Sequence, residues 1–206
     1  MCFRNAVGFF EKGHSYLQTA DFVARGVEAG NLKLNFDDPV DFLYAHSLEL
    51  MLKGCLLLDD PAANPNEYGH DTLRLFDEVL SRKFGGKILG AACENLRNNW
   101  KSHLRKARDI YALKFDVDET ALSELGIASN AEIGEALPSL RKQVSWIAER
   151  NRASGGKFRY PVNENYRRQI VDAFGIRMDV VRSSISWGCA DIYHGFRRLC
   201  SEGDHE

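Results

Sequence analysis

The stretch from residue 40 to residue 58 most strongly constrains what this chain can fold into. VDFLYAHSLELMLKGCLLL spaces apolar residues three and four apart over about five helical turns. The leucines at its end cover nearly the whole circumference of such a helix. A helix that is apolar almost all round usually occupies the centre of a bundle. The sequence therefore predicts a central helix here, with Pro39 in its first turn, where proline is tolerated.

Helical spacing recurs along almost the whole chain. It predicts further helices over 4–28, 72–80, 88–114 and 131–150, and a last helix that begins after a cap at Asn163. No segment of useful length alternates apolar and polar residues, so no strand is predicted. We expect an all-α bundle of about six helices.

Two of these helices carry more detailed expectations. In the helix over 72–80, we expect Leu73, Phe76 and Leu80 to form the inward face. The glycines of the last helix either break it or let another helix approach closely. Separately, KFGGK at 83–87 is interpreted as a turn.

The composition is that of one globular domain over residues 1–206, with 115–137 as a small helical insertion. The chain is 44% hydrophobic and 27% charged, and 206 residues can bury a sizeable core. Five scattered cysteines favour reduced thiols in a cytoplasmic protein. No apolar run approaches the length that crosses a membrane, and the net charge of −2 excludes a global bias toward nucleic acid.

A charged strip interrupts the apolar helix over 40–58. His46, Glu49 and Lys53 lie three and four residues apart, so they align on one side of the helix. Glu49 precedes Lys53 by four, which is the favourable order for an ion pair. Taken alone, the strip favours a partly exposed pair that solubilises the one solvent-facing edge of this helix.

Three short motifs occur along the chain, and their order is more specific than any one of them alone. Ser47-x-Glu49-x-x-x-Lys53 is followed by Gly69-His70-Asp71 at a helix start, and much later by Arg159-Tyr160-Pro161. This order resembles the HEPN domains, a helical family. The resemblance covers roughly residues 5–82 and 155–200. It implies a helical domain that often forms a homodimer, and relatives that include RNase toxins, partners of nucleotidyltransferases and nucleotide-binding modules.

The resemblance also implies candidate ligand-binding residues. Lys53 and His70 would line a pocket in which ammonium and imidazole meet a phosphate, and Arg159 and Tyr160 would join them. The alternative is structural. Asp71 is then a helix cap with His70 packed beside it, while Arg159-Tyr160-Pro161 sets the entry into the last helix.

HEPN ribonucleases carry an arginine, then a polar residue, and a histidine four to six residues further on. Arg97-Asn98 with His103 matches this spacing, and Arg198 with His205 does so without the polar residue. The chemistry implied is metal-free: His103 would handle the 2′-hydroxyl proton and Arg97 would stabilise charge on the phosphate. Arg97 lies mid-chain, however, whereas the family motif sits on a late helix, so an ordinary surface helix is the alternative.

Basic residues recur on the same helix at intervals of four, four and three, namely Arg97, Lys101, Arg105 and Arg108. We expect Lys101, Arg105 and Arg108 to contact phosphates. A second concentration comprises Arg150, Arg152, Lys157, Arg159, Arg167 and Arg168, beside Tyr160 and Tyr166. The alternative is a solvated face balanced by the acidic segment 116–135.

No metal-binding motif or cofactor motif is present, so neither is predicted. Two hypotheses for function follow. The first is a HEPN-like module that binds a nucleotide, RNA or a partner protein. The second is a metal-independent endoribonuclease of the toxin or defence type that uses Arg97 and His103. We expect no membrane association, and a homodimer with the glycine-containing last helix as its seam.

Overall fold

The computed structural model describes residues 4–32, 38–124, 139–153 and 178–203. These residues form seven α-helices and one short 3-10 helix, and none of them forms a strand, which confirms the predicted all-α bundle. The elements are α1 (Arg4–Glu28), α2 (Asp38–Asp59), η1 (Pro65–Tyr68), α3 (Thr72–Leu80), α4 (Phe84–Phe115), α5 (Glu119–Glu124), α7 (Leu140–Ala153) and α9 (Met178–Gly203).

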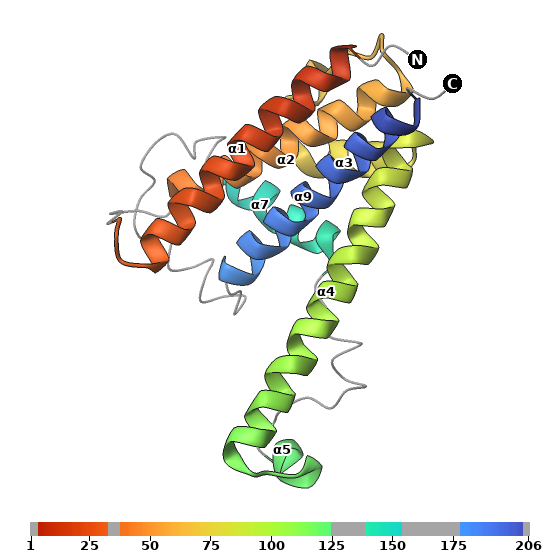
Figure 1. Cartoon of the computed structure of the whole chain (residues 1–206). Helices are drawn as coiled ribbons and strands as arrows, with labels where there is room; N and C mark the ends of the chain where they lie inside the picture. The colour runs from red at the N-terminus through yellow and green to blue at the C-terminus, as the bar shows by residue number, and fades with distance from the viewer. Residues whose placement is uncertain (1–3, 33–37, 125–138, 154–177, 204–206) are drawn as a thin grey trace.

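Helix α2 is the central helix, as its apolar circumference predicts. Every residue from Ser47 to Leu58 is buried. Helices α1 and α9 run beside α2, and α3 and α4 also pack against it (Figure 1). The rings of Phe10 on α1 and Phe196 on α9 stack with their centroids 4.0 Å apart. A Cβ at Gly54 of α2 would lie 2.9 Å from the Phe10 ring, so this glycine lets the three helices meet.

Helix α4 begins four residues earlier than its apolar spacing predicts. The interpretation of residues 83–87 as a turn is therefore wrong over most of that segment, since α4 starts at Phe84. The carboxylate of Asp59, at the end of α2, accepts hydrogen bonds from the backbone N–H groups of Phe84 and Gly85 at 2.8–3.1 Å. This cap comes from a distant part of the chain and satisfies N–H groups at the helix start.

The part of α4 up to Leu104 packs on the bundle core. Leu89, Leu96 and Trp100 belong to the core, and the Trp100 indole N–H donates to Ser184 on α9 at 3.0 Å. The rest of α4 leaves the bundle and leads to α5 (Figure 1). We call residues 101–124 the arm. The first part of the predicted insertion, 115–124, forms its tip, and residues 125–137 lie outside the described residues.

Two side-chain expectations need correction or refinement. On α3, Phe76 is buried as expected, but the inward face is completed by Thr72, Leu75 and Val79, while Leu80 is exposed. The face is rotated because α3 packs against both α2 and α7.

On α9, Gly188 and Gly195 do not break the helix. A Cβ at these positions would lie 2.8 Å and 3.0 Å from Leu140 and Ile88 of the same chain, so the glycines serve close packing within the protomer. The homodimer stays a prediction. Asn163, the expected cap of the last helix, lies outside the described residues.

Candidate functional site

The Glu49–Lys53 pair of the charged strip on α2 is buried, which contradicts the expected solvent-facing edge. Glu49 and Lys53 are only 5% and 7% exposed. The Lys53 ammonium lies 2.7 Å from Glu49 Oε1, and His70 Nδ1 lies 3.0 Å from Glu49 Oε2. His46 Nδ1 is 3.9 Å from the same oxygen. Glu49 is therefore the centre of a cluster of three basic side chains, which we call the Glu49 cluster.

The chain before α3 brings His70 to this cluster. Gly69 has φ +53°, a conformation that glycine adopts at little cost, and it turns the chain after η1. Asp71 then caps α3 by accepting a hydrogen bond from the backbone N–H of Arg74 at 3.1 Å, as the sequence predicts. His70 lies directly before this cap. Its side chain is 59% exposed, yet its Nδ1 reaches the buried carboxylate.

The electrostatics of the cluster are set by Glu49. Burial raises the pKa of Glu49, but the imidazoles of His46 and His70 and the ammonium of Lys53 lower it more, to about 2. The carboxylate is thus ionised at neutral pH, and it compensates the charge of Lys53. Because a buried ion pair is satisfied internally, this arrangement ties the start of α3 to α2 and leaves Lys53 poorly placed to receive a phosphate.

The predicted catalytic residues lie on α4 with Trp100 between them in sequence. His103 lies six residues after Arg97, and this spacing rotates the helix by about 240°. Trp100 lies midway, and its side chain is buried against α9. Arg97 is exposed, while the side chain of His103 is outside the described part of the molecule. Positions 97 and 103 therefore lie on either side of Trp100, about 120° apart around the helix axis.

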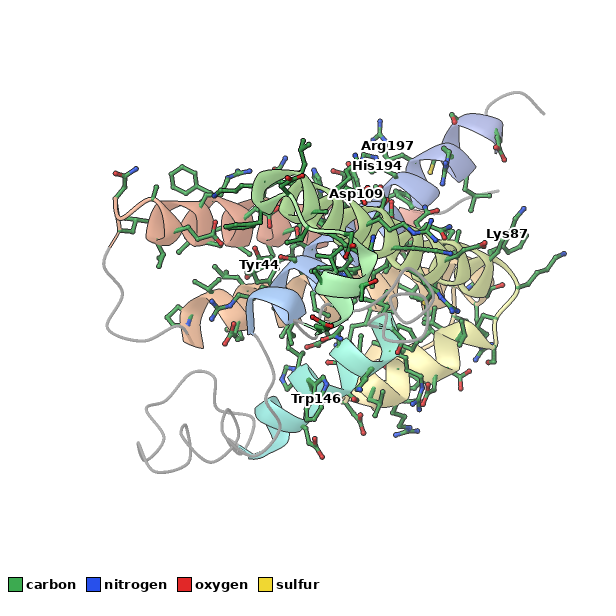
Figure 2. The ribbon with its side chains drawn as sticks, turned by 90° about the horizontal axis from the view of Figure 1, so that it is seen from below. Tyr44, Lys87, Asp109, Trp146, His194 and Arg197 are labelled. Atoms are coloured by element: carbon green, nitrogen blue, oxygen red, sulfur yellow. The ribbon has the colours of Figure 1, made fainter. Side chains whose placement is uncertain are left out.

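Of the four basic residues that were predicted to recur along one side of α4, three reach the surface. Arg97 and Arg105 are exposed and Lys101 is partly exposed. Arg108 is only 7% exposed, with its Nη1 3.9 Å from Asp109 Oδ1, so it does not share the open surface of the other three. Figure 2 views the molecule from the side of the arm and labels Asp109 on α4. We call Arg97, Lys101 and Arg105 the basic row.

The other predicted site residues cannot be placed. Arg159 and Tyr160, with the rest of the second basic concentration from residue 154 onward, lie outside the described ranges. Arg150 and Arg152 are on or near the end of α7, but their side chains are not described either. Within the described residues, no group of three or more histidine, cysteine, aspartate or glutamate side chains is placed to hold a metal ion.

A second buried polar group joins α1, α2 and α9, and sequence reasoning missed it. Asp21 accepts hydrogen bonds from the hydroxyls of Tyr44 and Ser186 at 2.8 Å and 2.9 Å. Nearby along the same helices, Arg182 lies 2.6 Å from the fully buried Asp41. The partners are up to 165 residues apart, so no local spacing could have identified them. Their positions at three helix contacts indicate a structural role.

Comparison of this chain with protein-family models, with curated proteins and with solved structures found no match. No helix in the described part of the chain combines the length and apolar character needed to cross a membrane. The resemblance to HEPN domains therefore continues to depend on the order of the short motifs.

Proposed function

We propose that this chain is a binding module that holds a phosphate-rich ligand, either RNA or a nucleotide, on the outward surface of α4. The observation that supports this most directly is the basic row. Its three cations recur every four residues, or about 6 Å along the helix axis. The row spans the middle of α4, and the far part of this helix leaves the bundle (Figure 1).

The row is better suited to phosphates than the Glu49 cluster is. Arginine guanidinium groups at a surface form charge-assisted, two-pronged hydrogen bonds to phosphate oxygens. In the Glu49 cluster, by contrast, a phosphate would compete with an ionised carboxylate 2.7 Å from Lys53. We therefore assign Lys53 and His70 a structural role and the basic row the binding role.

The same geometry favours binding over cleavage. A metal-free ribonuclease needs a histidine and an arginine at one phosphate. Positions 97 and 103 lie about 120° apart around α4, on either side of the buried Trp100, and they lie mid-chain rather than on a late helix.

The proposal is tested by reversing charges in the row. We expect K101E/R105E to weaken binding of a fluorescein-labelled RNA oligonucleotide at least tenfold in fluorescence anisotropy. We also expect the wild-type slope of log affinity against log salt to be about −2, because each phosphate contact on a single strand contributes about −0.7. The double variant should lose most of this slope.

Lys12 provides the matched control. It is an exposed lysine on α1, away from the row, and K12E makes the same kind of charge change. Equal affinities for the wild type and K101E/R105E, or an equal loss in K12E, would rule out the row as the binding surface.

A further inference from the structure

The far part of α4 carries two exposed aliphatic side chains on one side. Ile110 is 65% exposed and Leu113 is 86% exposed. They lie three residues apart, so they are neighbours about 60° apart around the helix axis. Single exposed apolar residues are ordinary, but two neighbours on a helix that extends away from the bundle form a patch that another molecule can reach (Figure 1). We call Ile110 and Leu113 the arm patch.

The arm patch and the basic row lie on different sides of α4. Helical geometry places Arg97, Lys101 and Arg105 more than about 100° around the axis from the centre of the patch. Arg108, which is only 7% exposed, also lies on the side away from the patch. A molecule bound to the arm patch therefore leaves the basic row uncovered.

Charges of opposite sign border the arm patch along the helix. Lys106 is exposed, lies one turn before Ile110, and points between the directions of Ile110 and Leu113. Asp116 and Asp118 follow the end of the helix, and both are exposed. The patch thus has a cation toward the bundle and two carboxylates toward the tip.

From this order of charges we infer that the arm patch binds the arm patch of a second copy of this chain, with the two helices antiparallel. When Ile110 packs on the partner's Leu113, two-fold symmetry packs Leu113 on the partner's Ile110. Lys106 then lies opposite position 117 of the other copy, between the partner's Asp116 and the partner's Asp118. A parallel pair would instead place Lys106 beside Lys106 and Asp116 beside Asp116, and like charges repel.

The packing of α9 supports this place for the seam. The glycines expected to form a dimer seam on α9 are filled from within the protomer, because Leu140 approaches Gly188 and Ile88 approaches Gly195. The arm patch, by contrast, is open. The inference does not depend on the proposed function, since the basic row faces away from the seam and stays available in both copies.

The test is sedimentation velocity of the full chain at several concentrations. A contact made by four aliphatic side chains and two symmetric ion pairs is small, so we expect the wild type to be mainly dimeric at about 100 µM and monomeric at about 1 µM. L113E should remain monomeric at about 100 µM, because a carboxylate replaces the apolar contact. K106E should also be monomeric there, since its carboxylate meets the partner's Asp116. K106E/D116N should recover part of the dimer, and asparagine tolerates the φ of 50° at this position.

Phe22 supplies the matched control, because it is 69% exposed on α1 and F22E makes the same kind of change away from the arm. F22E should form the dimer as the wild type does. K101E/R105E should also form it, although this variant weakens RNA binding. All of these positions reach the surface, so the variants should keep the urea unfolding curve of the wild-type monomer. A wild type that stays monomeric at about 100 µM, a dimer that survives in L113E, or an equal loss in F22E would overturn the inference.

Discussion

Replacing Glu49 by glutamine tests whether the Glu49 cluster holds the fold together. The amide keeps the shape of the side chain but removes the charge that compensates Lys53, which is only 7% exposed. An uncompensated buried ammonium is costly, and breaking a buried pair from one side typically costs about 3–5 kcal/mol. We expect E49Q to lower the free energy of unfolding at pH 7 by about 3 kcal/mol.

The lowered pKa of Glu49 gives an independent value for this loss of stability. The pKa of Glu49 falls from an ordinary 4.5 to about 2 in the folded chain, and this difference corresponds to about 3 kcal/mol. Because the folded pKa is the lower one, the stabilisation is complete above about pH 4.5. It disappears as the pH falls toward 2 and the carboxylate becomes protonated in the folded state too.

The assay is urea unfolding of the wild type and E49Q at pH 7, 5, 4 and 3. The difference between their free energies of unfolding should be largest at pH 7 and 5 and should shrink from pH 4 to pH 3. Asp77 is the control: it pairs with Arg141 at the surface, and its lowered pKa is caused mainly by that hydrogen bond. D77N should change stability far less, since water screens exposed pairs. A wild-type advantage over E49Q that stays constant from pH 7 to pH 3 would refute the reasoning.

Two further predictions concern the packing and the chemistry of α4. In G85A the new Cβ would lie 2.7 Å from the backbone carbonyl oxygen of Cys55, so we expect the free energy of unfolding in urea to fall by about 1–3 kcal/mol. A Cβ at Gly90 has nothing within 4 Å, so G90A should raise the free energy of unfolding by about 0.5–1 kcal/mol. If G85A were as stable as G90A, then α2 and α4 would not meet this closely. For the ribonuclease hypothesis, H103A should leave any RNA cleavage in EDTA unchanged on a gel; wild-type cleavage that H103A abolishes would contradict the binding-only proposal.

The candidate sites were predictable only in part. The spacing of Glu49 and Lys53 predicts that they pair, because residues four apart on a helix are neighbours. The burial of the pair was not predictable, since it depends on His70 and the start of α3, which follow 21 residues later. Likewise, the four-residue spacing identified the basic row, but only the fold distinguishes exposed Arg105 from buried Arg108.

The sequence by itself determined the elements of this protein and the central place of α2. Helical periodicity, caps such as Asp71 and an apolar circumference are local properties that act within one or two turns. The tertiary structure alone decided where α4 begins, which face of α3 is buried and that the arm leaves the bundle. These features depend on contacts between distant segments, such as Asp59 with Gly85 and Trp100 with Ser184, and the free energy of those contacts is absent until the helices have packed.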